Sequence, residues 1–256
     1  MSLQITLLQS KLHWEDPVSN REAFAERLTH LDDTDLVLLP EMFTTGFSMN
    51  VEAHAEDGQN SPTVDWMKRQ ADRHQTAIAG SVMVKEAGHY YNRLYWVQPD
   101  GKVLQYDKKH LFSMAKENEV YTAGEERIII EYKGWRIAPF ICYDLRFPAW
   151  NRNVQNYDLA IYVANWPAVR SHHWRSLLVA RAIENLSYVA AVNRVGTDGK
   201  GHLYSGDSSV IDPAGQLLAY QAHGEGILNA TLDKEHLLAT RKKFPFLADR
   251  DGFEFL

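Results

Sequence analysis

The chain contains a single cysteine, Cys142, which stands where an apolar run gives way to a polar segment. Residues 135–141 are mostly apolar, and Tyr143 and Asp144 follow directly. A nucleophile at such a strand end lies beside backbone N–H groups that can bind an oxyanion. A lone cysteine is, however, more often a small buried core residue. A reactive role for Cys142 therefore depends on the groups that accompany it.

Two further reactive side chains, Glu41 and Lys108, also follow predicted strands. If the three strand ends meet at one edge, their groups suit the cleavage of an amide. A thiolate attacks the carbonyl carbon, a carboxylate moves the proton, and an ammonium stabilises the oxyanion. Taken singly, a glutamate after proline or a lysine in a charged run is usually a solvated loop residue. The combination makes the chemical interpretation specific.

Composition restricts the class of partner. The formal net charge is −6, from 27 basic and 33 acidic residues, which argues against nucleic acid or an anionic membrane surface. The sequence has no apolar run of about 18 residues, so no membrane-spanning helix is expected. Residues 1–9 have no basic lead and predict a strand instead of a secretory signal. With one cysteine, the cytoplasm is the expected compartment.

Strand and helix patterns alternate along residues 1–256 without a linker or repeat, which predicts one α/β domain. The strands are apolar on both faces, so either two packed sheets or one large covered sheet would fit. The phenylalanine-rich tail, residues 244–256, is expected to dock on its own domain or on a second copy. The predicted strands are 5–8, 36–39, 78–84, 159–164, 188–193 and 227–231, the hairpins 92–106, 128–141 and 208–220, and the helices 21–31, 63–74, 172–186 and 233–243.

Three segments, Leu39–Phe43, Tyr106–Phe112 and Ile141–Pro148, resemble the signature segments of the nitrilase superfamily, in the same order and at comparable spacing. Residues 181–185 and 206–215 are also similar to family segments, so the resemblance covers nearly the whole chain. It implies a four-layer α-β-β-α sandwich and a Glu-Lys-Cys triad. The family commonly forms homodimers and needs no cofactor.

The resemblance assigns roles by motif. Glu41 matches the general base, Lys108 the oxyanion-stabilising lysine and Cys142 the nucleophile, with the Tyr143 N–H as a second oxyanion donor. A further glutamate of the family matches Glu117, which stands seven residues before a glycine.

Two positions qualify this match. Glu119 is the rival for the role given to Glu117. Asp107 departs from the arginine that usually follows the tyrosine of the lysine segment, which is expected to affect only the surroundings of Lys108.

Residues 42–49, 143–148 and 164–167 look most like the omega-amidase group of the superfamily. That group removes the terminal amide of 2-oxoglutaramate or 2-oxosuccinamate, giving the acid and ammonia through a thioester. Phe43, Phe47 and Trp166 are expected to hold the short chain of the substrate. A cation must bind the substrate carboxylate. The candidates are Arg146, Arg170 and Arg194, with His172 and His173 as helpers, and Arg146 is equally expected to pair with a buried carboxylate.

Other interpretations remain open. Another amidase, an N-carbamoyl hydrolase or a nitrilase would use the same triad, and a non-catalytic binding member is a further class. The eleven histidines show no metal-ligand spacing, so no metal is expected. The glycine-rich segment 196–206 lacks the Gly-Lys-Ser/Thr sequence and the helix start of a phosphate loop, and it is predicted to be a flexible loop.

Overall fold

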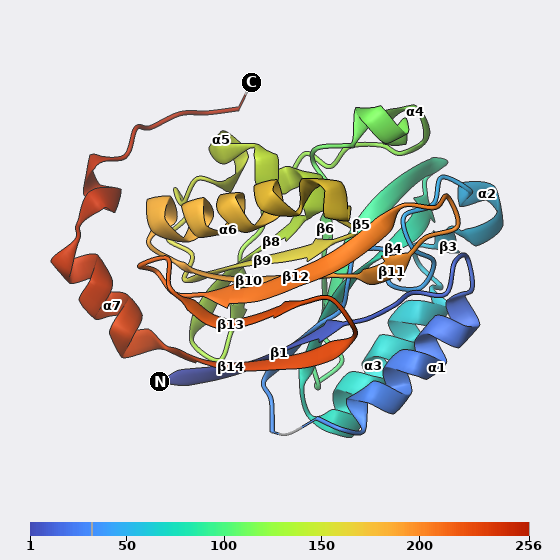
Figure 1. Ribbon diagram of the computed structural model, residues 1–256, viewed down its shortest axis with the longest axis horizontal. Helices are drawn as coiled ribbons and strands as arrows, with labels where there is room; N and C mark the ends of the chain where they lie inside the picture. Colours follow the sequence, from blue (N-terminus) through green and yellow to red (C-terminus); the bar gives the residue numbers. More distant parts are fainter. Residues whose placement is uncertain (32, 256) are drawn as a thin grey trace.

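Two β-sheets pack face to face at the centre of the molecule, and helices cover their outer faces (Figure 1). The computed structural model describes residues 1–31 and 33–255. Helices α1 (Pro17–Leu28) and α3 (Pro62–His74) lie on one outer face, and α6 (Ser171–Asn185) lies on the other. The α-β-β-α sandwich implied by the resemblance is therefore confirmed.

The first sheet has the strand order β14-β1-β2-β4-β5-β6, with the short β3 beside β4. Strands β1, β2 and β4 run parallel, and α1 and α3 form the crossovers between them. Strands β4, β5 and β6 continue as antiparallel hairpins, of which the sequence predicted only the second. The bounds are β1 (Ser2–Gln9), β2 (Leu36–Leu38), β3 (Glu56–Asp57), β4 (Ala77–Glu86), β5 (His89–Val97), β6 (Val103–Asp107) and β14 (Gly226–Asp233).

The second sheet has the order β11-β12-β10-β9-β8-β7, with β13 beside β12. Its central strands β8, β9 and β10 are parallel, and β12 pairs antiparallel with β10. The predicted hairpins β7–β8 and β12–β13 are both present. The bounds are β7 (Ile130–Tyr132), β8 (Trp135–Ile141), β9 (Leu159–Ala164), β10 (Tyr188–Asn193), β11 (Val195–Thr197), β12 (Leu203–Ile211) and β13 (Leu217–Ala222).

Capping residues define where α1 and α3 begin. The Ser61 side chain accepts the Val64 N–H at the start of α3, directly before Pro62 at the first helical position. The first helix starts earlier than expected, because Asp16 caps it and a proline occupies its first position. The other helices are α2 (Val51–His54), α4 (Glu117–Val120), α5 (Pro148–Asn151) and α7 (Lys234–Lys243), and the 3₁₀ turns are η1 (Ser113–Ala115), η2 (Cys142–Arg146), η3 (Ala168–Arg170) and η4 (Phe246–Asp249).

The apolar core has two main parts. The larger cluster fills the space between the sheets and beneath α6, and it contains the fully buried Trp96, Trp135 and Trp174. A smaller cluster lies between the first sheet and helices α1 and α3, and it contains Phe24 and Phe43. Burial of apolar surface on this scale is the main force that holds four layers together. No helix among the described residues has the length and apolarity needed to cross a membrane.

The glycine-rich segment 196–206 differs from its prediction. Its ends pair as the antiparallel hairpin β11–β12, in which Val195 opposes Ser205. The buried carboxylate of Asp198 holds the turn, because it accepts the N–H groups of Lys200 and His202 at 2.9 Å each. A side chain that replaces backbone partners in this way gives a glycine-rich turn a fixed conformation.

Candidate active site

Cys142 occupies the sharp turn between β8 and η2. Its φ of 42° lies in the left-handed region, which costs a residue other than glycine about 1–3 kcal/mol. The Asp144 carboxylate supports this turn by accepting the Ile141 N–H at 3.0 Å. Cys142 is 8% exposed and lines a cavity. The strained turn thus presents the thiol to the cavity from a rigid strand end.

The predicted strand ends meet beside this thiol. The Lys108 Nζ lies 2.8 Å from Glu41 Oε1 and 2.9 Å from Glu117 Oε2, and all three side chains are fully buried. Glu119, by contrast, has a side chain that is 60% exposed and pairs with Lys116 on the surface. The ammonium therefore lies between two buried carboxylates, and Glu117 is the second of them.

Two asparagines that the sequence interpretation missed fix the orientation of Glu41. Asn92 Nδ2 donates to Glu41 Oε1 at 2.8 Å and to Glu117 Oε1 at 3.2 Å. The Asn165 backbone N–H donates to Glu41 Oε2 at 2.8 Å. Asn165 directly follows β9, so its place after a buried parallel strand was a usable signal. Asn92 lies within β5, where the sequence pattern gave no such signal.

Electrostatics assign the resting protonation states. Burial opposes the charge on Lys108, but the carboxylates of Glu117 and Glu41 outweigh it and raise the pKa of the ammonium. Burial and the Glu41 carboxylate raise the pKa of the Cys142 thiol well above its ordinary value, although Lys108 opposes them. Burial also raises the pKa of Glu117, against the opposing effect of Lys108. Cys142 is therefore a thiol at rest, beside a lysine that keeps its proton.

An oxyanion formed near the sulfur would meet two donors. One is the Lys108 ammonium, and the other is the backbone of Tyr143, the second residue of η2. The N–H groups at the start of a helix have no acceptor within it, so they are free for a ligand.

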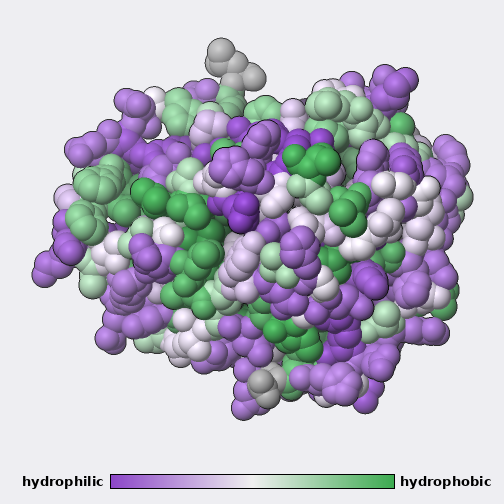
Figure 2. All heavy atoms as spheres, in the orientation of Figure 1, coloured by the Kyte–Doolittle hydropathy of each residue, from purple (hydrophilic) through white to green (hydrophobic). Residues whose placement is uncertain are grey.

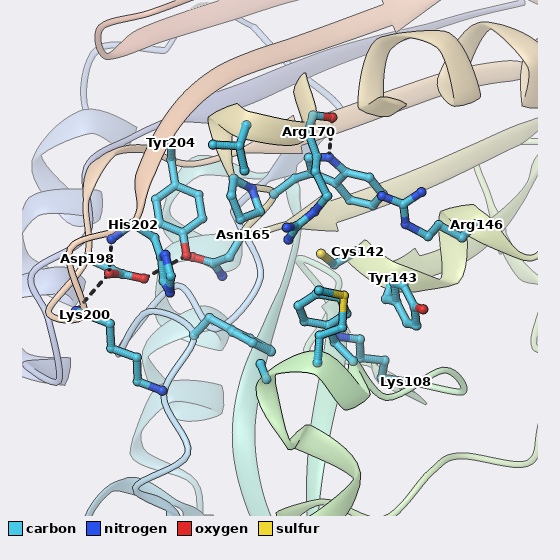
Figure 3. A pocket seen from close by; sticks show the side chains of 17 residues that line it. Lys108, Cys142, Tyr143, Arg146, Asn165, Arg170, Asp198, Lys200, His202 and Tyr204 are labelled. Atoms are coloured by element: carbon cyan, nitrogen blue, oxygen red, sulfur yellow. Dashed lines mark hydrogen bonds between the residues drawn. The ribbon is translucent and has the colours of Figure 1, made fainter. Parts of the chain in front are cut away.

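The cavity above Cys142 has a volume of about 350 Å³. Lys108 is fully buried and Cys142 nearly so, and these two residues form the inner end of the cavity. Figure 3 shows Arg146 and Arg170 near Cys142, with Tyr204 and Asp198 across from them. The residues that line it are Phe47, Lys108, Phe112, Met114, Ala115, Cys142, Tyr143, Arg146, Asn165, Trp166, Pro167, Val169, Arg170, Asp198, Lys200, His202 and Tyr204.

The aromatic residues predicted to hold a substrate fall into two groups. Trp166 lines the cavity, and so does Phe47, whose ring lies 5.1 Å from the Lys108 Nζ. Phe43 does not line it: its side chain is fully buried on the other side of the first sheet, 5.5 Å from the ring of Phe24. The prediction that Phe43 contacts the substrate is therefore wrong, because Phe43 packs in the core between the first sheet and helices α1 and α3. Residues 41–45 form a turn in which Met42 has a φ of 43°. This turn directs Phe43 toward Phe24 of α1 and Trp66 of α3, which the motif could not reveal.

The predicted cations also separate. Arg146 and Arg170 line the cavity, and burial and then the charge of Arg170 lower the pKa of Arg146. The Arg146 guanidinium lies 4.7 Å from the Trp166 ring, and Nη2 is 3.2 Å from His173 Nδ1. No carboxylate among the described residues pairs with either arginine, so the expected ion pair of Arg146 is absent from this part of the chain.

Arg194 and His172 lie elsewhere. Arg194 is fully buried, with its guanidinium 4.7 Å from the ring of Tyr204 in β12. His172 lines a separate groove between α6 and β13.

The β11–β12 hairpin forms a wall of the cavity that the sequence interpretation did not foresee. Tyr204 O–H donates to Asp198 Oδ2 at 2.9 Å, and the exposed Lys200 and His202 lie on the same side of the cavity (Figure 3). Segment 196–206 therefore contributes a charged and hydrogen-bonding surface to the cavity.

The residue that departs from the family pattern, Asp107, has a local partner. Its carboxylate accepts from Arg93 Nε at 2.7 Å and from Arg93 Nη2 at 2.9 Å, across the β5–β6 pair. Arg93 is nearly buried and also contacts Glu86. This pair lies beside Lys108 along the chain, and the partners of Lys108 are Glu41 and Glu117, not Asp107.

A thiol, a buried ammonium and two carboxylates around one cavity match the chemistry of carbon–nitrogen bond hydrolysis, and residues 11–242 match the family described as carbon-nitrogen hydrolase. The chain belongs to the carbon-nitrogen hydrolase family. This carbon-nitrogen hydrolase is 49% identical over 252 residues to the omega-amidase YafV of Escherichia coli, covering 98% of each chain. It is 35% identical to a 2-oxoglutaramate amidase of Bacillus subtilis, covering 97% of this chain and 98% of that protein.

Solved structures agree with this assignment. A superfamily protein of Xanthomonas campestris, whose crystal structure has an arsenic adduct in its active site, superposes with a TM-score of 0.97 at 45% identity. The match covers 100% of this chain and 99% of that one. Nit3 of Saccharomyces cerevisiae superposes with a TM-score of 0.86 at 27% identity, covering 95% of this chain and 94% of that one.

Proposed function

We propose that this carbon-nitrogen hydrolase is an omega-amidase. It hydrolyses the terminal amide of a small 2-oxo dicarboxylate monoamide, such as 2-oxoglutaramate or 2-oxosuccinamate, to the acid and ammonia. The observation that carries the proposal is the buried Glu41–Lys108–Glu117 cluster beside Cys142. The cavity above Cys142 also holds two arginines that pair with no carboxylate of residues 1–31 and 33–255. The similarity to an omega-amidase and a 2-oxoglutaramate amidase supports the same substrate class.

The first half of the reaction forms a thioester. Because the pKa of Cys142 is raised, Glu41 removes the thiol proton as the sulfur adds to the amide carbon. Lys108 Nζ and the Tyr143 N–H stabilise the resulting oxyanion. The carbon–nitrogen bond then breaks, and the departing nitrogen takes the proton from Glu41 and leaves as ammonia.

The second half releases the acid. Glu41 accepts a proton from a water molecule as the water oxygen adds to the thioester carbon, and the same donors bind the new oxyanion. The carbon–sulfur bond breaks, and the sulfur recovers a proton from Glu41. Glu117 contacts Lys108 and holds the ammonium in place throughout both halves.

Recognition of the substrate follows from charge and shape. The chain has a formal net charge of −6, so an anionic substrate needs a local positive site. Arg146 and Arg170 supply two guanidinium groups on one side of the cavity, each able to bind a carboxylate with two parallel hydrogen bonds. Trp166 and Phe47 line the cavity beside them and provide apolar surface for the short chain.

A panel of amides followed by ammonia release tests the substrate class. We expect 2-oxoglutaramate to have the highest kcat/KM, above uncharged aliphatic amides, N-carbamoyl amino acids and nitriles. Preference for an N-carbamoyl amino acid would favour the alternative hydrolase, and no turnover of any amide would favour a binding protein. Intact mass spectrometry during turnover should show an acyl adduct on the wild type and none on Cys142→Ala. Full activity of Cys142→Ala would end the proposed mechanism.

We also infer a cytoplasmic homodimer in which residues 1–256 act as one domain. Hydrophobic side chains gather between α6 and β13 on the face shown in Figure 2. They include Ile183 (46% exposed), Leu217 (56%) and Leu218 (47%). Such a patch is typical of an interaction surface.

The role of the tail, residues 244–256, stays a prediction. The Phe255 ring lies 5.0 Å from Trp150, which supports docking on its own domain. Phe255 remains 49% exposed, however, which leaves surface for a second copy. Deleting residues 245–256 and measuring the mass in solution separates the two: a monomer supports tail-mediated assembly, and an unchanged dimer contradicts it.

A further inference from the structure

Asp144 is a fully buried carboxylate that the reaction described above does not use. Its Oδ1 accepts the His110 N–H at 2.9 Å and lies 2.9 Å from the His110 Nδ1. Its Oδ2 accepts the Tyr106 O–H at 2.7 Å and the Ile141 N–H at 3.0 Å. A buried carboxylate is costly unless its oxygens are satisfied, and here four protein groups satisfy them.

The four groups belong to the two segments that carry Lys108 and Cys142. Tyr106 and His110 stand two residues before and two residues after Lys108. Ile141 precedes Cys142, and Asp144 itself follows it by two residues. The Asp144 carboxylate thus contacts the Lys108 segment on both sides of Lys108. It also holds the turn that carries Cys142.

The two segments come from different sheets. Lys108 follows β6 at the edge of the first sheet, and Cys142 follows β8 in the second. Apolar packing between sheets is non-directional, so it does not by itself fix the relative place of two strand ends. Hydrogen bonds with short distances and preferred angles do. Asp144 supplies such hydrogen bonds, from the segment that follows β8 to the residues on either side of Lys108.

The surroundings of Asp144 add rigidity. Trp150 Nε1 donates to the Tyr106 hydroxyl at 3.0 Å. The His110 ring stacks on Phe147, with 3.6 Å between the ring centroids and 6° between their planes. Asn151 Nδ2 donates to the Asp144 carbonyl at 2.6 Å. Movement of the carboxylate would therefore disturb several groups at once.

We propose that Asp144 is a positioning residue that fixes the Lys108 ammonium relative to the Cys142 thiol. This inference rests on the proposed roles of Lys108 and Cys142. Its importance follows from the sensitivity of catalysis to distance, because a misplacement of about 1 Å can cost about a hundredfold in rate. Asp144 acts through the two segments that it joins and touches no reacting atom.

The test is Asp144→Asn, which keeps the shape of the side chain but turns an NH₂ group toward hydrogen-bond donors. We expect kcat for 2-oxoglutaramate to fall about tenfold to a hundredfold, with KM within about twofold. The pH profile of the rate of Cys142 alkylation by iodoacetamide should shift to higher pH, because a displaced Lys108 stabilises the thiolate less. Unchanged kcat and an unchanged alkylation profile would overturn the proposal, even if the melting temperature falls.

Asp158→Asn is the matched control. Asp158 is also buried and charge-paired, but it stands just before β9, at the end of that strand opposite to Asn165. This variant should lose stability without changing kcat or the alkylation profile. An equal fall in kcat in both variants would reduce the effect of Asp144→Asn to general destabilisation and overturn the proposal.

Tyr106→Phe carries the test if Asp144→Asn does not fold. It removes one donor to Oδ2 and should lower kcat less than Asp144→Asn, with the same direction of shift in the alkylation profile. Wild-type kcat and an unshifted alkylation profile in Tyr106→Phe would overturn the proposal. Where Asp144→Asn does fold, the two effects should not add in the double variant, because both residues act through one network. Full activity of Cys142→Ala, by contrast, would end the proposed function and leave the contacts of Asp144 as structural only.

Discussion

The inner end of the cavity and its arginine side differ in how their charges are satisfied. At the inner end, the Lys108 ammonium is fully buried between Glu41 and Glu117, and Asn92 and Asn165 hold the carboxylates. On the arginine side, Arg146 and Arg170 lie against the aromatic rings of Trp166 and Phe112, and no carboxylate among the described residues pairs with them.

This difference separates the chemistry from the recognition. Charges that are already paired and oriented need no reorganisation during the reaction, which is the main electrostatic advantage of an enzyme site. Guanidinium groups that stack on aromatic rings keep their N–H groups for another partner. In the proposed reaction, the inner end binds the oxyanion and the arginine side binds the carboxylate of the substrate.

Lys108→Met should cause the largest change, because it leaves two buried carboxylates without their cation. We expect the free energy of unfolding to fall by about 3–5 kcal/mol. Ammonia release should fall by at least about 10²- to 10³-fold. Urea denaturation and a coupled ammonia assay measure the two effects. Lys109→Met, at the partly exposed neighbour, should stay near wild type in both, and equal stability of the two variants would contradict the buried cluster.

Glu41→Gln tests the base at the same end of the cavity. Glutamine keeps an oxygen for Lys108 but cannot take a proton, so kcat should fall by about 10²- to 10⁴-fold while the protein stays folded. Steady-state kinetics and circular dichroism provide the measurement. Glu119→Gln, on the surface, is the control and should be unaffected. Retention of more than a tenth of wild-type kcat in Glu41→Gln would remove it from the mechanism.

Arg146→Met and Arg170→Met test the arginine side. A hydrogen bond to a charged group contributes about 1.5–3 kcal/mol, so KM for 2-oxoglutaramate should rise about tenfold to a hundredfold. KM for an uncharged amide such as butyramide should not change, because it has no carboxylate to lose. Arg175→Met, in the separate groove between α6 and β13, serves as the control. Equal increases for both substrates would mean that the arginines shape the cavity without binding the carboxylate.

The pH dependence of Cys142 alkylation gives the smallest but most direct signal. Thiolate is the reactive form, and burial together with Glu41 raises the pKa of Cys142. Below that pKa the thiolate fraction grows about tenfold per pH unit, so the rate should still rise above about pH 8.5, where a free thiol begins to level off. Rates with iodoacetamide from pH 6 to about 9.5 measure it. A plateau below about pH 8 would indicate a preformed thiolate.

Much of the architecture could be predicted from residue patterns. Proline after the Ser61 cap, and apolar runs such as residues 159–164 and 188–193, are local signals, and they correspond to α3, β9 and β10. Segment 196–206 was misjudged, because the contact that orders it is the carboxylate of Asp198, and glycine content alone does not reveal it.

The candidate site shows the same division. The motif contained Glu41, Lys108 and Cys142 and pointed to Glu117 over Glu119. It could not show that Asn92, deep within β5, would reach two carboxylates.

The amino-acid sequence by itself determined the reactive groups and their order, because side-chain chemistry and strand-ending motifs are local properties. Only the tertiary structure decided which groups share the cavity. In the folded protein Phe43 packs in the core, and Arg194 is buried against the Tyr204 ring. Arg146 and Arg170 line the cavity. The physical reason is that a side chain's partners depend on which face of a strand it occupies and on what packs against that face. Those contacts join residues far apart in the chain.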